Sequence, residues 1–401
     1  MAALTQTSPT APVFPFRATH RFKLSGRYTD VGTGLAASFD RHMNILHLGN
    51  PFFLQDFRQL GHDVKWAAYD RTADFVLSPY VESMHSLSAQ FPARWFPDLV
   101  VVGDDSGPPK LLGLEALDVP LVWYAIDSHL HARWHQAYAA AFDVICVAQR
   151  DWVPRYRVDP ERQIVSWQPL FCHVPDDGDS GGLRDTPVSF VGTLNRQWNP
   201  ERVALIEGLQ RRYPIAVGSG GYRELFNRSL MVLNQSAAND VNFRTFQAMA
   251  CGALLVGERI GNGFNDLFQD RTHCALYERG NVEQVIEIVE HYCDRPAERD
   301  AVARQGYEAV MAAHTSLHRA QAILQVVGAA PLQRQIRVRR SRQLQIQSSL
   351  VLVYESAERT HLQAAERTPE GARKQYLLTV AGQYRFLATT IRTQLGLQVA
   401  C

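Results

Sequence analysis

Residues 230–258 read LMVLNQSAANDVNFRTFQAMACGALLVGE, and this stretch decides the fold class. Its first apolar run is typical of a buried strand, which we expect to end near Asn234. Helical spacing follows over residues 242–250, and Gly252 permits a tight turn into a second apolar run. A strand, a helix and another strand in this order predict one unit of a parallel β-sheet.

The same alternation recurs along the whole chain. Further strands are predicted by short apolar runs at 43–49, 64–69, 98–105, 120–127, 143–148, 188–194 and 214–220. Helical stretches separate these runs, so the expected class is α/β, with two doubly wound parallel-sheet domains. Ligands of such sheets bind at the carboxyl ends of the strands.

One segment rich in Gly, Pro and Asp, VPDDGDSGGLRDTP at 174–187, indicates a linker between two domains. The predicted organisation has four parts, which are an N-terminal extension at 1–42, a first domain at 43–180, a second domain at 186–330 and a C-terminal extension at 331–401. A chain of 401 residues is long enough for two such cores.

Composition narrows the class of protein. The chain is 46% hydrophobic and 20% charged, which is typical of a globular protein. A net charge of +1 argues against general nucleic-acid binding. The six cysteines are scattered without a CxxC pair, and no apolar run is long enough to cross a bilayer. The N-terminus does not resemble a secretory signal, so we expect a cytoplasmic protein.

The C-terminal extension is basic, with eleven Lys or Arg against four Glu from residue 331 onward. Its sharpest run, RQIRVRRSRQ at 334–343, is either a solvated helix face or a docking surface for an acidic partner or a membrane surface. Apolar residues at helical spacing over 376–395 predict an amphipathic helix, which either packs on the body or forms a partner surface.

The helix predicted over 242–250 carries a candidate anion site. We expect the backbone amides of Asn242 and Phe243 to point out of its N-terminus, where the helix dipole favours negative charge. Arg244 lies in the first turn and can donate two hydrogen bonds to a diphosphate. Gln247, one turn later, is suitably placed to reach a ribose hydroxyl. No Walker loop is present, and no GxGxxG occurs in a dinucleotide-binding context.

The block NDVNFRTFQAMACGALLVGERIGNGFNDLF at 239–268, followed by HTSLHRA at 314–320, resembles the GT-B glycosyltransferases, particularly their CgeB-like (spore-maturation-type) branch. The resemblance covers roughly residues 43–325 and is strongest in the second domain. It implies two Rossmann-like domains facing a cleft. The second would bind a UDP- or GDP-type nucleotide-diphosphate sugar without a metal or a tightly bound cofactor.

The same resemblance assigns a second donor-side element. In FVGTLNRQWNPER at 190–202, it implies that Gly192, Thr193 and Arg196 face the pyrophosphate, and it adds Asn234 at the end of the neighbouring strand. A surface turn with solvated arginines is the plainer interpretation of this loop.

Two positions depart from the family pattern. Many retaining GT-B enzymes carry two glutamates eight positions apart, whereas this chain has Asn239 and Gln247. An amide can hydrogen-bond a hydroxyl but cannot supply negative charge to a cationic transition state. A catalytically silent nucleotide-sugar-binding or interaction protein therefore remains an alternative, and a nucleotide-sugar epimerase is a further one.

The first domain is expected to bind the acceptor, which could be a glycan, a protein or a small molecule. Its most distinctive segment is WYAIDSHLHARWH at 123–135, where Asp127 or His129 is our candidate acceptor base. His131 and His135 share a helix face, but no HExxH pattern supports zinc, so we assign no metal site. Ordinary surface or core histidines are the plainer interpretation of this cluster.

Overall fold

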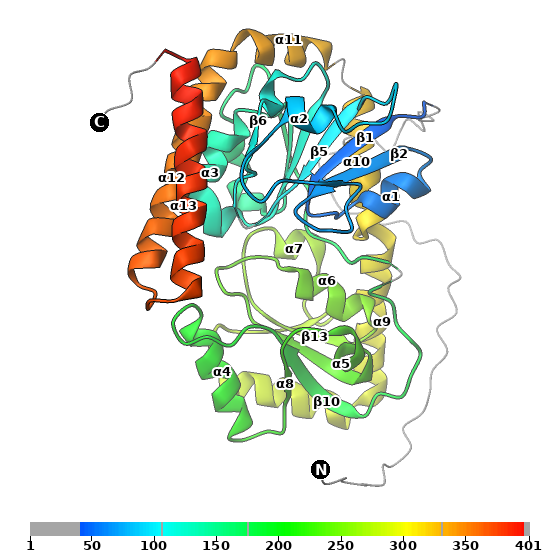
Figure 1. Ribbon diagram of the computed structural model, residues 1–401. Helices are drawn as coiled ribbons and strands as arrows, with labels where there is room; N and C mark the ends of the chain where they lie inside the picture. Colours follow the sequence, from blue (N-terminus) through cyan, green and yellow to red (C-terminus); the bar gives the residue numbers. More distant parts are fainter. Residues whose placement is uncertain (1–40, 106, 175, 330–331, 397–401) are drawn as a thin grey trace. The chain divides into compact units, whose positions relative to one another are not determined.

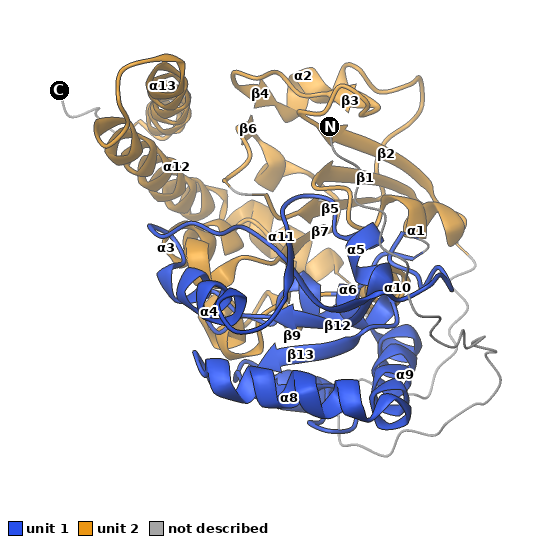
Figure 2. Cartoon of the chain, turned by 90° about the horizontal axis from the view of Figure 1, so that it is seen from below, with its two compact units in different colours: residues 1–40, 171–315 blue, residues 41–170, 316–401 orange. Residues whose placement is uncertain are grey.

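The computed structural model describes residues 41–105, 107–174, 176–329 and 332–396. The predicted N-terminal extension lies outside the described residues, apart from Arg41 and His42. The chain divides into two compact units (Figure 2), one of which contains residues 171–315. The other combines residues 41–170 with the chain from Ser316 onward. We call these unit 1 and unit 2.

Unit 2 is built on a seven-stranded sheet of order β3-β2-β1-β5-β7-β8-β9, in which all neighbours pair in parallel. Its strands are β1 (Asn44–Gly49), β2 (Asp63–Ala68), β3 (Phe75–Val76), β5 (Leu99–Gly103), β7 (Leu121–Ala125), β8 (Val144–Val147) and β9 (Ile164–Trp167). A small second sheet pairs β4 (Glu82–Ser83) with β6 (Leu111–Leu112). The connections contain α1 (Leu54–Gln59), α2 (Met84–Ser88), η1 (Leu114–Ala116), α3 (Ser128–Ala139) and η2 (Arg150–Tyr156).

Unit 1 repeats this plan with a five-stranded parallel sheet of order β11-β10-β12-β13-β14. The strands are β10 (Thr186–Val191), β11 (Ala216–Gly218), β12 (Ser229–Asn234), β13 (Leu254–Glu258) and β14 (Ala275–Tyr277). The helices are α4 (Pro200–Gln210), α5 (Arg223–Arg228), α6 (Phe243–Ala250), α7 (Phe264–Leu267), α8 (Val282–Asp294) and α9 (Pro296–Ala313). The α/β prediction with two doubly wound domains is therefore confirmed.

The central strands form because their residues are apolar on both faces. All residues of β5, β7 and β13 are buried, as expected for parallel strands that are covered by helices on both sides. Gly49 ends β1 with a positive φ of 76°, and a Cβ at this position would lie 2.6 Å from the backbone oxygen of Gly103. Glycine is thus required where β1 and β5 end side by side.

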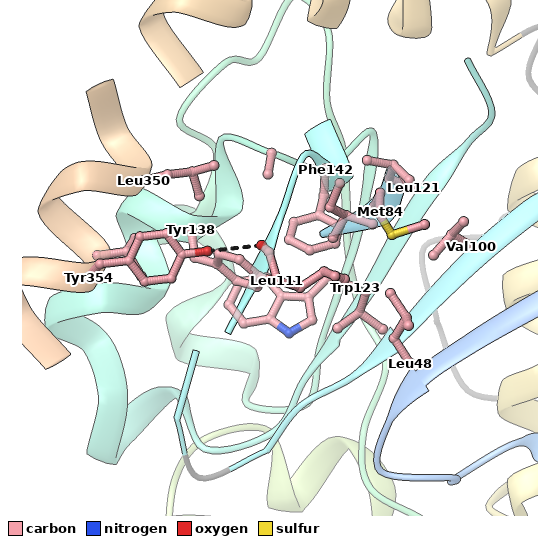
Figure 3. Close-up of a cluster of buried hydrophobic side chains, with 14 of the residues drawn as sticks. Leu48, Met84, Val100, Leu111, Leu121, Trp123, Tyr138, Phe142, Leu350 and Tyr354 are labelled. Atoms are coloured by element: carbon pink, nitrogen blue, oxygen red, sulfur yellow. Dashed lines mark hydrogen bonds between the residues drawn. The ribbon is translucent and has the colours of Figure 1, made fainter. Parts of the chain in front are cut away.

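Four C-terminal helices belong to unit 2, and they are α10 (Ser316–Ala329), α11 (Gln333–Ser341), α12 (Gln343–Glu366) and α13 (Ala372–Gln394). In Figure 1, α12 and α13 lie side by side as a long hairpin. Leu350 and Tyr354 of α12 enter the same hydrophobic core as Trp123 and Tyr138 (Figure 3). Tyr384 and Leu387 of α13 belong to the same core, so the amphipathic helix predicted near the C-terminus packs within unit 2. The predicted second domain extended to residue 330, whereas α10 groups with unit 2.

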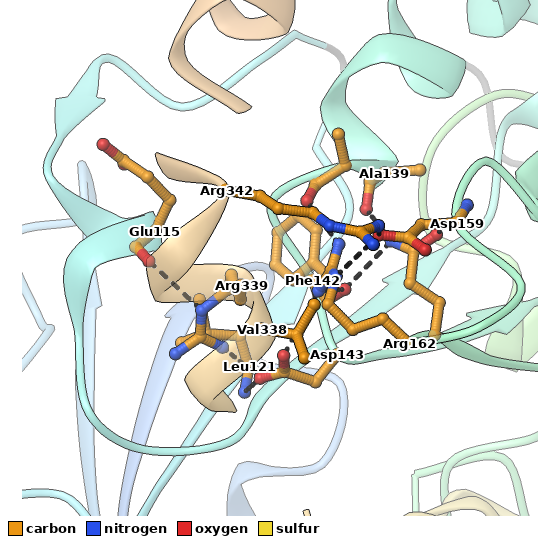
Figure 4. Close-up of polar contacts among 12 residues, drawn as sticks. Glu115, Leu121, Ala139, Phe142, Asp143, Asp159, Arg162, Val338, Arg339 and Arg342 are labelled. Atoms are coloured by element: carbon orange, nitrogen blue, oxygen red, sulfur yellow. Dashed lines mark hydrogen bonds and ion pairs between the residues drawn. The ribbon is translucent and has the colours of Figure 1, made fainter. Parts of the chain in front are cut away.

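The basic run at 334–343 forms internal contacts (Figure 4). The Arg339 side chain is fully buried, where it pairs with Asp143 and donates to the backbone oxygens of Glu115 (3.1 Å) and Val119 (3.0 Å). Arg342 donates to Asp159 at 2.6 Å. Arg339 and Arg342 of the basic run thus attach α11 to the rest of unit 2.

Within the described residues, no helix combines the length and the apolar character needed to span a bilayer.

Candidate functional site

A pocket of about 410 Å³ lies in unit 1, at the carboxyl ends of β10 and β11 and the N-terminus of α6. This is the edge at which parallel sheets bind ligands. The lining residues are Val191, Gly192, Thr193, Arg202, Ser219, Gly220, Tyr222, Phe226, Asp240, Asn242, Phe243, Arg244 and Gln247.

Arg244 is held rigidly at the pocket wall. Its Nε donates to the backbone oxygen of Val191 at 2.7 Å, and its Nη1 donates to Oδ1 of Asn234 at 2.8 Å. The guanidinium lies over the ring of Phe190, 4.8 Å from the centroid. Burial and the nearby charge of Arg202 lower the pKa of Arg244 to about 10, so the group remains a cation at neutral pH.

Gly192 makes room for this arginine. A Cβ at residue 192 would lie 2.5 Å from Nη2 of Arg244 and 2.9 Å from Cζ of Phe190. Any larger residue would therefore collide with the guanidinium or with the ring beneath it. The glycine at the end of β10 is explained by close packing.

A second guanidinium, that of Arg202, lines the same pocket. Its Nε donates to Oε1 of Gln235 at 2.9 Å, and its Nη2 donates to the Gln235 backbone oxygen at 3.0 Å. Burial lowers the pKa of Arg202. Asp240 also lines the pocket, and its carboxylate accepts a hydrogen bond from Oγ of Ser236 at 2.6 Å. Two fixed cations at one pocket favour an anionic ligand, because a desolvated positive charge attracts its counterpart strongly.

The N-terminus of α6 adds a third attraction for anions. Asn242 is the N-cap residue and Phe243 is the first helical residue, and both line the pocket. The Asn242 side chain makes no capping bond, and its buried Oδ1 has no hydrogen-bond partner in the described part of the chain. The helix dipole at this end favours a negatively charged group.

Two further lining residues, Gln247 and Tyr222, belong to a chain of hydrogen bonds. Nε2 of Gln247 donates to the Tyr222 hydroxyl at 2.8 Å, and that hydroxyl in turn donates to Oδ1 of Asp177. Burial, followed by the contact with Asp177, raises the pKa of Tyr222, so the phenol remains protonated. These contacts fix the orientation of the Gln247 amide. Tyr222 and Asp177 were not predicted, because an isolated Tyr and a linker Asp carry no motif.

Most of the predicted donor-side residues meet at this pocket. Gly192, Thr193, Asn242, Phe243, Arg244 and Gln247 line it. Asn234 is buried and does not line the pocket. Its side-chain Nδ2 donates to Oγ1 of Thr245 at 3.0 Å, and its Oδ1 accepts a hydrogen bond from Nη1 of Arg244.

Two other donor-side positions lie elsewhere. Arg196 is exposed and pairs with Glu207 at 2.5 Å, outside the pocket lining. Asn239 is exposed with a positive φ of 60°, and its Oδ1 accepts the backbone N–H of Gly261 at 3.0 Å. Asn239 therefore shapes the loop before α7 and does not line the pocket.

The predicted acceptor-side residues lie in unit 2, at the turn between β7 and α3. Asp127 is the N-cap residue of α3, and the backbone amides of Ile126 and Asp127 donate to Oδ2 of Asp104 at 2.9 and 3.2 Å. His129 is the second residue of α3, and its buried Nδ1 has no hydrogen-bond partner within the described residues. Asp104, at the end of β5, thus orders the turn that carries both candidates.

The other two histidines of this segment, His131 and His135, make packing and hydrogen-bond contacts within unit 2. His135 is fully buried, with Nδ1 2.6 Å from the Tyr156 hydroxyl and Nε2 3.6 Å from Oδ2 of Asp104. His131 packs against His135 with ring centroids 5.5 Å apart, and burial lowers the pKa of His131. In the described part of the chain, no three potential ligands gather to hold a metal ion.

Two Rossmann-like parallel sheets, an arginine-lined pocket at the strand ends of one of them and added C-terminal helices define the GT-B class of fold. Residues 181–325, less than half of the chain, match a family model described as glycosyl transferase-like. No curated protein matches the sequence significantly.

Solved structures support the same class. Anabaena Alr3699/HepE in complex with UDP-glucose is 13% identical, with 72% of this chain and 100% of that chain covered and a TM-score of 0.50. A glycosyltransferase from Rickettsia africae is 9% identical, with 71% and 98% covered and a TM-score of 0.52. An alpha-glucosyltransferase in complex with UDP-glucose and DNA is 11% identical, with 72% and 100% covered and a TM-score of 0.52. At these identities the likeness establishes the fold, and with the family match it supports a glycosyltransferase.

Proposed function

We propose that this protein transfers a sugar from a nucleoside-diphosphate sugar to an acceptor, as a glycosyltransferase of the CgeB-like branch and hexosyltransferase type. The observation that carries the proposal is the placement of Arg244. Its guanidinium is fixed by Val191 and Asn234 at the wall of a pocket that also contains Arg202 and the N-terminus of α6.

Glycosyl transfer releases a nucleoside diphosphate, so negative charge develops on the leaving oxygen as the glycosidic bond breaks. Arg244, Arg202 and the α6 amides would stabilise that charge. Because Arg244 is already held by two acceptors, little reorganisation is needed when the charge appears. The proposal therefore assigns this role to protein cations and requires no metal ion.

The proposed donor is a UDP-sugar, with a GDP-sugar as the alternative. Two of the structural neighbours are described as complexes with UDP-glucose, which makes the uridine nucleotide the first choice. Gln247 would bind a ribose hydroxyl, since its amide is oriented by Tyr222.

On the acceptor side, Asp127 or His129 would remove the proton from the attacking hydroxyl. Their shared position at the carboxyl end of β7 supports this role. The acceptor class is a glycan, a protein or a small molecule.

The test is isothermal titration of the full chain with UDP, GDP and their sugars. We expect at least one nucleotide to bind, and Arg244→Ala to weaken it by about tenfold to a hundredfold, because a charged hydrogen bond contributes roughly 1.5–3 kcal/mol. Arg212→Ala is the matched control, since this arginine pairs with Glu283 at the surface of the same unit. Absence of nucleotide binding, or equal binding by both variants, would overturn the donor-site assignment.

The catalytically silent alternative has one specific observation in its favour. Gln247 replaces a carboxylate that many retaining GT-B enzymes use, and an amide supplies no negative charge. Assays of nucleotide-sugar hydrolysis and transfer over a broad acceptor panel distinguish an active glycosyltransferase from a catalytically silent binding protein. Tight nucleotide binding without any turnover would favour the silent protein.

A further inference from the structure

Unit 2 contains a second cavity, of about 390 Å³, which the proposed function does not use. One wall comes from α2, β6 and η1, and the other comes from α12 and α13. Ligand sites typically measure about 300–1,000 Å³, so this space is large enough for a small molecule. Figure 3 shows four residues of its lining, Met84, Leu111, Leu350 and Tyr354.

The lining combines an apolar wall with a few polar groups. The apolar side chains are Met84, Leu111, Leu112, Ala116, Leu350, Tyr354 and Ile391. The polar side chains are Ser83, His85, Glu115, Gln343, Gln347 and Gln394. Among these described lining residues there is no lysine or arginine, so the cavity differs from the arginine-lined pocket of unit 1. It offers hydrogen-bond acceptors and a carboxylate, and it has no fixed cation for a phosphate.

Glu115 is the chemically distinctive member of this lining. Only 3% of the residue is exposed, yet no cation pairs with its carboxylate among the residues that the structure describes. Its Oε1 accepts one hydrogen bond, from Nε2 of Gln347 at 3.1 Å. Arg339 donates to the Glu115 backbone oxygen and forms its direct ion pair with Asp143, so its attraction for the Glu115 carboxylate acts only over a longer distance.

A buried carboxylate is unfavourable unless a cation or several donors compensate it. We propose that the cavity binds a small organic cation, a primary ammonium on an aliphatic body. The ammonium would lie at Glu115, and the body would contact Leu111, Leu350 and Ile391. The amide oxygens of Gln343 and Gln394 would accept its remaining N–H groups.

Calorimetric titration of the full chain tests this assignment with a matched pair of probes, hexylammonium and 1-hexanol. The two share the same alkyl body and differ in charge. We expect hexylammonium to bind at least about tenfold more tightly, a preference that one buried opposite charge readily supplies. Equal affinity of the two probes, or no binding of hexylammonium up to about 10 mM, would overturn the proposal.

Two variants locate the site. Glu115→Gln should abolish the preference for the ammonium while 1-hexanol still binds. Gln394→Arg, at an exposed position of the lining, should weaken hexylammonium by placing a cation beside the site. Persistence of the preference in both variants would show that binding occurs elsewhere. The Gln394→Arg arm decides the matter even if Glu115→Gln does not fold, and nucleotide titration of the same samples reports independently on unit 1.

Discussion

Replacing Arg339 by leucine removes a fully buried guanidinium at the point where α11 meets unit 2. Its loss leaves the backbone oxygens of Glu115 and Val119 without their donor and leaves Asp143 with one arginine, Arg162, at 3.3 Å. Removing one partner of a buried ion pair typically costs about 3–5 kcal/mol. Because Arg162 still compensates Asp143 in part, we expect a loss of about 3 kcal/mol, near the lower end of that range.

Adjacent Arg340 provides the control, because it pairs with Asp118 at 3.0 Å while both side chains are at least half exposed. Arg340→Leu should change the free energy of unfolding by at most about 1 kcal/mol. Urea unfolding gives both values, and thermal unfolding should show a decrease of about 6–12 °C in Tm for Arg339→Leu alone. Equal effects of the two substitutions would refute the claim that buried Arg339 holds α11 against the rest of unit 2.

The pH dependence sharpens this comparison. Burial outweighs the two arginines and raises the pKa of Asp143 in the native protein. In the Arg339→Leu variant the Asp143 carboxyl should bind a proton more readily, and protonation removes the buried negative charge that has lost its partner. The stability deficit of Arg339→Leu should therefore be larger at pH 8 than at pH 5.

Three further predictions concern the pocket and the core. Gly192→Ala should weaken nucleotide binding by about tenfold or more in calorimetry, because its Cβ would displace Arg244, whereas Gly221→Ala, with no atom within 4 Å, should be neutral. Tyr222→Phe removes the hydroxyl that accepts a hydrogen bond from the Gln247 side-chain amide. Nucleotide affinity should therefore fall about threefold to tenfold while the fold is kept. Burial lowers the pKa of His47 from 6.5 to about 3, so the unfolded chain binds a proton here at a higher pH than the folded protein does. The free energy of unfolding therefore decreases as the pH falls below 6.5. Between pH 7 and 4.5 this amounts to about 2–3 kcal/mol, and His47→Leu should lack this part of the acid destabilisation in urea titrations.

The fold was largely predictable because its strands are short apolar runs, and such runs separated by helical stretches indicate the buried strands of a parallel sheet. The predicted runs at 98–105 and 120–127 became β5 and β7, since strands buried on both faces show no alternation that could be misread. Domain membership was harder to predict. Helix α10 follows α9 closely in sequence, but Arg319 donates to the backbone oxygen of Pro169 at 2.6 Å. These two residues are 150 positions apart in the chain, so no local pattern encodes their contact.

The candidate site was predictable where one helix supplies the chemistry. Asn242, Arg244 and Gln247 follow from the spacing on α6, whereas the contacts of Tyr222 with Asp177 depend on tertiary packing. Arg196 was predicted from its place in a loop that resembles a phosphate-binding loop. In the structure it pairs with Glu207 of α4 at the surface, a contact between residues eleven positions apart that the loop motif does not encode.

Unit 2 is assembled from two separate parts of the chain, and this has a consequence for the order of folding during synthesis. The strands of its sheet are complete once residue 170 has emerged, but α12, which packs on α3 and joins the core of Trp123 and Tyr138, is made only after unit 1. The described residues of unit 1 form one segment, 171–315, which can fold first, since domains generally fold as units. A nascent or truncated chain that ends after unit 1 therefore leaves the apolar side chains of α3 without their partners on α12, so chaperone demand should be greatest just before α12 and α13 emerge.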